Sequence, residues 1–226
     1  RPEDSVEALP DLYRQLSETP QAVKPGTLVE FCPCGTAYSF FNMPGFNISV
    51  ASDPTSSYQV RTQAKTLKAL MGDALPFFGD HVELSDGGDD FASTVGVGGV
   101  IGTQFVLPSL ATKRSKSDLT AAREKEFEKW LRIYREKMLS QGWYLGELYD
   151  IGFDIPETHV IRKQQTMYYA FYAKHWQGPI ELRGLENRPY EVLDYENGKS
   201  FGVVSGPAAR LTVEFDQHLL LQATPR

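Results

Sequence analysis

Two short polar segments, twenty residues apart, carry the residue types best suited to chemistry. Cys32-Pro33-Cys34-Gly35 follows the apolar run at 27–31, and Ser52-Asp53-Pro54 follows the apolar run at 47–51. A carboxyl group at the end of a strand can protonate a leaving group when partial burial favours its protonated form. Asp before Pro is also a common helix start, so Asp53 has two interpretations, a general acid or a helix cap.

The two cysteines have several open roles. A disulfide between Cys32 and Cys34 would be strained, because the two residues lie too close in the chain. A metal site would need further ligands, and the four histidines form no local cluster, so we predict no metal. A nucleophilic cysteine would need a histidine partner, and two buried thiols at the end of a strand are an equally ordinary interpretation.

A third polar segment is the acidic stretch at 80–90, which contains Asp80, His81 and Glu83. It could bind a cation or a sugar, although its spacing is not that of a calcium-binding EF-hand loop. A solvated surface is the commoner meaning of such a run of charges.

Elements of α/β type must position these segments. Apolar periodicity predicts helices at 3–24, 56–71 and 120–140. Because of Pro10 and Pro20, we expect either a break in the first helix or a late start. Short apolar runs predict strands at 27–31, 47–51 and 76–84. The glycine-rich stretch at 96–105 is open between a strand and a helix start. Strand-loop-helix units of this kind present functional loops at the carboxyl ends of their strands.

Beyond residue 166 the pattern changes to short strands separated by turns. The strand candidates lie at 167–172, 180–183, 190–195, 201–204 and 211–215, with a turn at 196–199. Their spacing of about ten residues predicts a small antiparallel sheet or sandwich. The sequence therefore predicts an α/β fold followed by an all-β fold.

Composition narrows the function classes. The 226 residues carry a formal net charge of −6 and no long cluster of Lys and Arg, which argues against a nucleic-acid binder. No apolar run approaches the roughly 18 residues that span a bilayer, so we predict no integral membrane protein. The chain begins at Arg1 without Met, so we expect either processing or the downstream piece of a longer polypeptide.

Together, the segments Glu30-Phe31-Cys32-Pro33-Cys34-Gly35 and Ser52-Asp53-Pro54 resemble the retaining α-galactosidases of glycoside hydrolase family 36, the melibiase type. The stretch at 79–83 looks like the family's next strand, and residues 176–195 are similar to its C-terminal β-domain. The resemblance implies that residues 1–150 are the C-terminal portion of a (β/α)8 TIM barrel. It also implies that residues 151–226 are an antiparallel β-sandwich domain.

The resemblance assigns roles to three residues. It implies that Asp53 is the general acid/base, that Cys32 contacts a sugar hydroxyl, and that Gly35 lies in the same substrate-binding loop. Two departures concern these loops, because the family's Cys-x-Gly-Gly-Gly is here Cys-Pro-Cys-Gly-Thr and its second Asp after Ser-Asp is absent. The family's nucleophilic Asp lies on an earlier strand, so we expect the nucleophile upstream of this chain. Glu83 is the less favoured candidate for that role.

The function that the resemblance implies is a retaining α-glycosidase that hydrolyses terminal α-linked galactosides without a metal or organic cofactor. Its partners would be an oligosaccharide or glycoconjugate substrate and the upstream part of the same polypeptide, and a homo-oligomer stays open. Glycosyl transfer of the raffinose-synthase type and a non-catalytic carbohydrate-binding module are the alternatives. The cytoplasm is the favoured compartment.

Overall fold

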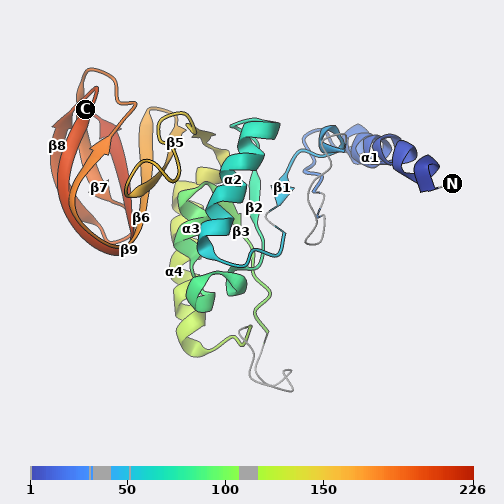
Figure 1. The fold of residues 1–226 in the computed structure, drawn as a ribbon, viewed down its shortest axis with the longest axis horizontal. Coiled ribbons are helices and arrows are strands. Elements are labelled where there is room, and N and C mark those ends of the chain that lie inside the picture. Colours follow the sequence, from blue (N-terminus) through green and yellow to red (C-terminus); the bar gives the residue numbers. More distant parts are fainter. Residues whose placement is uncertain (1, 31, 33–41, 51, 107–116) are drawn as a thin grey trace.

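A computed structural model describes residues 2–30, 32, 42–50, 52–106 and 117–226. Two sheets organise these residues (Figure 1): a three-stranded sheet of order β1-β2-β3 and a six-stranded sheet of order β4-β5-β6-β9-β7-β8. The mixed α/β first part and the antiparallel second part agree with the coarse fold prediction. Whether the first sheet is part of a (β/α)8 barrel stays a prediction.

The small sheet is wholly parallel and positions the site. Its strands are β1 (Ser49–Val50), β2 (Phe77–Gly79) and β3 (Gly99–Ile101), and they lie side by side in chain order. Helix α2 (Ser57–Met71) connects β1 to β2, and α3 (Phe91–Gly96) lies between β2 and β3 in the chain. Outside β1, Glu30 forms a further parallel bridge with Ile48. Four successive segments therefore end at one edge of the sheet.

Local side-chain caps explain where two helices begin. The Ser56 side chain accepts a hydrogen bond from the Gln59 N–H at the start of α2. Thr120 does the same for the Arg123 N–H at the start of α4 (Ala121–Lys137), which ends at the left-handed residue Met138. Such caps satisfy amide groups that have no partner within the helix. The predicted helices at 56–71 and 120–140 are confirmed within the usual uncertainty at helix ends.

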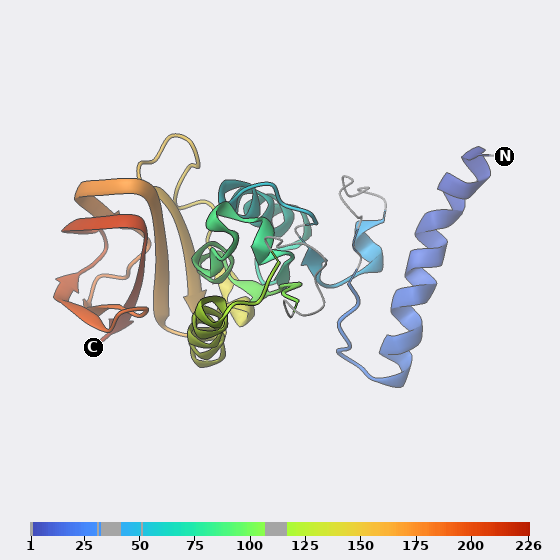
Figure 2. The same cartoon turned by 90° about the horizontal axis from the view of Figure 1, so that it is seen from below.

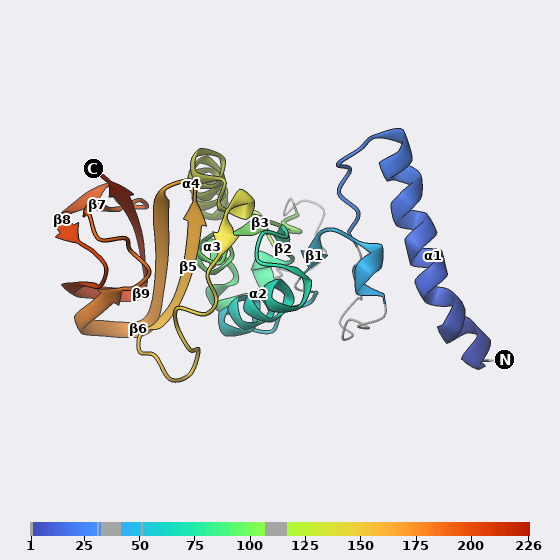
Figure 3. The same cartoon turned by 90° about the horizontal axis from the view of Figure 1, so that it is seen from above.

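Helix α1 (Pro2–Val23) is continuous through Pro10 and Pro20, so the predicted break or late start is wrong. Each proline removes one backbone hydrogen bond, and the remaining bonds of a 22-residue helix keep its course. Figures 1, 2 and 3 all place α1 at the opposite end of the molecule from the six-stranded sheet. None of the helices in the described part of the chain combines the length and hydrophobicity that crossing a membrane requires.

The large sheet is antiparallel throughout, and its longest pairing joins β6 to β9. The two predicted strands at 167–172 and 180–183 are parts of one strand, and a strand at 157–163 was not predicted. The sheet also includes β4, whose residues 143–144 precede position 151. The division of the chain into two domains at position 150 stays a prediction. The six strands are β4 (Trp143–Tyr144), β5 (Glu157–Lys163), β6 (Thr166–Leu182), β7 (Pro189–Asp194), β8 (Lys199–Ser205) and β9 (Ala209–Pro225).

Apolar packing joins the two parts. One cluster within the large sheet is built from buried side chains such as Tyr169 and Leu221. A second cluster packs α3 and α4 against the sheet, with Trp130 and Tyr172 at its centre. Figures 1 and 3 show α4 next to β5 and β6. The parallel strands are thereby anchored to the large sheet through the helices that follow them.

Candidate active site

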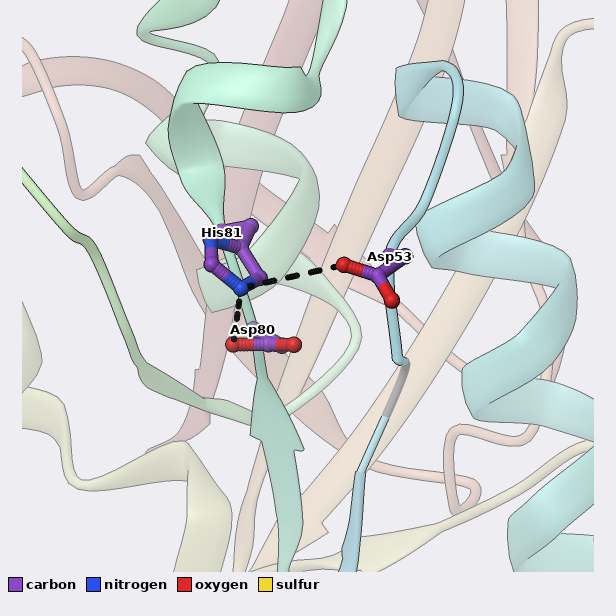
Figure 4. A group of neighbouring side chains, drawn as sticks. All are labelled: Asp53, Asp80 and His81. Carbon is purple, nitrogen blue, oxygen red and sulfur yellow. Dashed lines mark ion pairs between the residues drawn. The ribbon is translucent and has the colours of Figure 1, made fainter. Parts of the chain in front are cut away.

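The carboxyl ends of the parallel segments bring polar side chains together. Asp53 follows β1, and Asp80 and His81 follow β2 directly. Figure 4 shows the Asp53 and Asp80 carboxyl groups directed at the imidazole of His81. Residues at the carboxyl ends of parallel strands are where α/β enzymes place their chemistry. The site thus combines residues that lie almost thirty positions apart in the sequence.

The imidazole of His81 is the centre of this group. Its Nε2 lies 3.4 Å from Asp80 Oδ1 and 3.8 Å from Asp53 Oδ1, and its Nδ1 lies 2.8 Å from Glu83 Oε1. From the segment after β3, Gln104 Nε2 lies 3.2 Å from His81 Nε2. Burial alone would lower the pKa of His81, but the hydrogen bond to Glu83 and the charges of the three carboxylates raise it above its ordinary value.

Glu83 is the buried anchor of the site. It lies in the 3₁₀ helix η2 (Val82–Leu84) and is only 2% exposed. Besides the His81 contact, its carboxylate accepts hydrogen bonds from the Thr103 hydroxyl at 3.1 Å and from the Gln104 N–H at 3.2 and 3.3 Å. Burial would raise the pKa of Glu83, but the hydrogen bonds from His81 and Gln104 outweigh burial and hold that pKa below its ordinary value. Glu83 therefore stays ionised, and a carboxylate so enclosed does not suit the role of substitute nucleophile.

Negative charge gathers around Asp80. Burial, together with the charges of Asp53 and Glu83, raises the pKa of Asp80, and the His81 imidazole and the Asp53 N–H offset this only in part. Burial and then the charge of Asp80 also raise the pKa of Glu30. The site is thus richer in carboxyl groups than the one imidazole can neutralise, and it favours a positively charged ligand or a shared proton.

Asp53 itself faces outward, with its side chain 53% exposed and its backbone in the left-handed region at φ 45°. The Ser52 hydroxyl donates to Asp53 Oδ2 at 3.5 Å. Because Ser56 supplies the cap of α2, the interpretation of Asp53 as a helix cap is wrong. A reachable carboxyl group at a strand end is available to a substrate.

Of the two sequence-predicted substrate-binding residues, one can be placed. Cys32 is exposed, which excludes the interpretation of a buried thiol, and its Sγ lies 3.5 Å from the Ser52 hydroxyl. Cys32 therefore lies on the same edge as Asp53, joined to it through Ser52. Gly35 and Cys34 lie outside the described residues.

The sequence analysis names Asp80 and His81 within the acidic stretch but does not place them beside Asp53. The acidic stretch at 80–90 is only partly the solvated surface that was the commoner interpretation, because Asp80 is half-buried and Glu83 is buried, whereas Asp86 and Asp89 are exposed. The missed signal was position: Asp80 follows its strand directly, as Ser52-Asp53 follow theirs. One ligand atom each of Asp53, Asp80 and His81 lies within 4.8 Å of the others. The ion pairs with the imidazole account for that spacing, and we assign no metal to it.

A separate cleft of about 1040 Å³ lies between the helices and the large sheet. Arg61, Asp89, Trp130 and Lys174 are among its lining residues, whereas Asp53, Asp80 and His81 are not. Two of its lining residues pair with each other, because the Arg61 guanidinium binds the Glu157 carboxylate at 2.6 and 2.9 Å. The candidate active site is therefore the edge of the parallel sheet and not this cleft.

No protein-family model matches the chain. A curated relative from Flavonifractor plautii, an "A type blood alpha-D-galactosamine galactosaminidase", is 34% identical over an alignment of 230 positions that covers 98% of this chain. The chain spans about a fifth of that relative's length, namely 20%. What that relative's name says of its activity and substrate applies to that relative alone.

Solved glycosidase structures share the fold at low sequence identity. Alpha-galactosidase I from Mortierella vinacea is 11% identical, with a TM-score of 0.57 over 96% of this chain and 63% of that chain. A family 27 β-L-arabinopyranosidase from Geobacillus stearothermophilus is also 11% identical, with a TM-score of 0.60 over 96% of this chain and 54% of that chain. At such identities these structures support the mixed α/β and antiparallel architecture alone. The named relative and both structural neighbours are glycoside hydrolases.

Proposed function

We propose that the protein carrying this chain is a retaining α-glycosidase that removes terminal α-linked sugars of the galactose type, galactosamine among them, from oligosaccharides or glycoconjugates. The observation that carries this proposal is the placement of Asp53 at the carboxyl edge of a parallel sheet, in a chain related over 98% of its length to a galactosaminidase. A glycosidase of the melibiase type, family 36, is the finer assignment.

Asp53 has the features of a general acid/base. It is exposed enough to reach a glycosidic oxygen, and the His81 imidazole lies 3.8 Å from its carboxyl group. In the first step its proton would move to the departing oxygen as the bond to the anomeric carbon breaks. In the second step its carboxylate would take a proton from the attacking water.

A retaining reaction also needs a nucleophile about 5 Å from the acid/base. We assign that role to an aspartate upstream of this chain, on an earlier strand of the same barrel. The strands of the small sheet lie in chain order and run parallel, with Glu30 extending the sheet beyond β1. This winding supports residues 1–150 as the C-terminal portion of a (β/α)8 barrel.

Asp80 supports an amino sugar as substrate. The atoms of Asp53 and Asp80 that face His81 lie within 4.8 Å of each other. In a glycoside the leaving oxygen and the C2 substituent occupy adjacent carbons, so one carboxyl group can serve the oxygen while its neighbour accepts hydrogen bonds from a C2 ammonium. An excess of carboxyl groups around Asp80 would bind that ammonium better than a neutral hydroxyl.

The test measures hydrolysis of methyl α-D-galactosaminide and methyl α-D-galactoside by the full natural polypeptide that carries this sequence. Asp53→Asn should lower kcat/KM for both by about 10²- to 10⁴-fold, the range of general acid–base catalysis. Asp80→Asn should lower it more for the galactosaminide. Full activity of Asp53→Asn would overturn the assignment. Product analysis with excess sugar acceptor separates hydrolysis from glycosyl transfer.

A further inference from the structure

His81 and Glu83 form a pair to which the reaction above assigns no role. We propose that His81, held in place by Glu83, is a positioning residue that orients the Asp53 carboxyl group and stabilises it as an anion once its proton has moved to the leaving group. This inference rests on the proposed function of Asp53. The geometry of three contacts and two backbone conformations carries it.

The first step of the argument is the fixed orientation of the imidazole. An ionised carboxylate only accepts hydrogen bonds, so Glu83 Oε1 at 2.8 Å requires a proton on His81 Nδ1. Glu83 cannot easily turn away, because the Thr103 hydroxyl and the Gln104 N–H hold both of its oxygens. The other ring nitrogen, Nε2, is thereby directed at Asp53 and Asp80 (Figure 4).

The second step is the backbone. Asp53 and His81 have φ angles of 45° and 50°, in the left-handed region. This region is uncommon for residues other than glycine, although Asp and His enter it more readily than most. Residues with a side chain in this region gather at functional sites, where the side chain is needed in one place. Here two such residues face each other across the edge of the sheet.

The third step is charge. The groups that face the imidazole are Asp80 and Glu83 from its own segment, Asp53 from the segment after β1, and the neutral Gln104 from the segment after β3. Three carboxyl groups and no described cation therefore surround it, which favours the protonated imidazole. Nε2 then carries a proton as Nδ1 does, so the Gln104 side chain must present its amide oxygen rather than its NH2 group to Nε2. A positive charge 3.8 Å from Asp53 Oδ1 stabilises that carboxyl group as an anion by direct Coulomb attraction.

The proton balance of the reaction stays simple. In the first step the proton passes from Asp53 to the glycosidic oxygen, and the resulting carboxylate remains beside the imidazolium. In the second step the carboxylate takes the proton of the attacking water. His81 keeps its own protons throughout, so its effect is on the ease with which Asp53 gives up its proton.

The experiment compares leaving groups with the full natural polypeptide. A methyl glycoside needs proton donation to depart, whereas a 2,4-dinitrophenyl glycoside departs almost without it. His81→Gln should lower kcat/KM about ten-fold or more for the methyl glycoside and less than about three-fold for the dinitrophenyl glycoside.

Two further variants keep the test decisive. Glu83→Gln should give the same dependence on the leaving group, because the ring loses its charged anchor. Gln104→Glu is the variant to use if the other two fail to fold, because position 104 is exposed. It places a competing acceptor beside His81 Nε2, where the Gln104 side chain now lies at 3.2 Å, and should give a smaller effect of the same kind. The matched control is His218→Gln, because His218 binds Glu196 at 2.7 Å outside the site. That control should leave both substrates unaffected.

The outcomes separate this inference from the proposed function. An equal loss for both leaving groups, or no loss at all, would overturn the positioning role while Asp53→Asn still abolishes hydrolysis. If Asp53→Asn retains hydrolysis, the proposed function fails first, and the role of His81 fails with it. A loss restricted to the methyl glycoside supports both.

Discussion

The edge of the parallel sheet and the six-stranded sheet differ in strand length, in exposure and in the role that we assign to each. The parallel strands are two or three residues long and end in charged, partly exposed side chains with left-handed backbones at Asp53 and His81. Strands β6 and β9 are 17 residues long and bury an apolar cluster. The comparison indicates that stability comes mainly from the large sheet, whereas the short strands place chemical groups.

Two histidines make the same comparison in detail. His81 and His159 each have a ring nitrogen 2.8 Å from a glutamate oxygen, of Glu83 and Glu157 respectively. Burial lowers the pKa of the fully enclosed His159, whereas several carboxylates raise the pKa of the partly exposed His81. The same histidine–glutamate contact is therefore part of the buried packing between the helices and the large sheet at His159, and part of the candidate active site at His81.

The largest expected effect on stability lies at the junction of the two regions. The Arg61 guanidinium binds the Glu157 carboxylate and the Ser93 hydroxyl in a buried setting. Arg61→Met should lower the free energy of unfolding by about 3–5 kcal/mol, because the buried Glu157 carboxylate loses its guanidinium partner and keeps only His159. Urea denaturation measures this. Arg210→Met, which removes an exposed pair with Glu181, is the control and should cost about 1 kcal/mol or less.

The next effect tests the core of the large sheet. Leu221 in β9 is fully buried, so Leu221→Ala should lower the free energy of unfolding by about 2–5 kcal/mol through lost burial and a cavity. Val203→Ala on the exposed face of β8 should change it by less than about 0.5 kcal/mol. Equal effects of the two substitutions in urea titrations would contradict the assignment of the core.

A smaller effect depends on pH. Burial would raise the pKa of Glu157, but hydrogen bonds from His159 and Arg61 outweigh it and hold that pKa at about 2, below the ordinary value of 4.5. The contribution of Glu157 to stability is therefore complete above pH 4.5 and is lost as the pH falls toward 2. The loss should amount to roughly 1–3 kcal/mol. Unfolding titrations of wild type and Glu157→Gln should diverge above this window and converge within it, and curves that stay parallel would refute the prediction.

The smallest effect should come from the active edge itself. Asn tolerates the left-handed conformation as well as Asp does, and the Asp53 side chain is largely exposed. Asp53→Asn should therefore change the free energy of unfolding by less than about 0.5 kcal/mol. Thermal melting of the variant checks this, and a large loss of stability would mean that Asp53 also stabilises the fold.

The parts of the fold that the sequence predicts well are those where the pattern is local. Helix α4 follows from its apolar stripe and the Thr120 cap. The sequence predicts two strands, at 167–172 and 180–183, where the structure has the single strand β6, because pairing with β9 continues through Gly178 and Pro179. Tertiary pairing therefore overrode a local signal.

In the candidate active site too, the residues that the sequence predicts are those recognisable from their local segment. Asp53 and Cys32 are recognisable from the segments that contain them, and the structure brings both to one edge. The contact between His81 and Asp53 depends on which strands are neighbours, and the burial of Glu83 depends on residues after β3. The sequence therefore indicates an acidic stretch at 80–90, but it does not show that Asp53, Asp80 and Glu83 all contact the His81 imidazole.

The most direct test of the central claim, that Asp53 is the acid/base, uses Asp53→Gly with a 2,4-dinitrophenyl α-galactosaminide and sodium azide. Without an acid/base the activated substrate still forms the glycosyl intermediate, and azide, which needs no base, then attacks it. The account predicts slow turnover that azide accelerates, with an α-glycosyl azide as product. Wild-type turnover of an unactivated glycoside by this variant, or no effect of azide on the product, would contradict it.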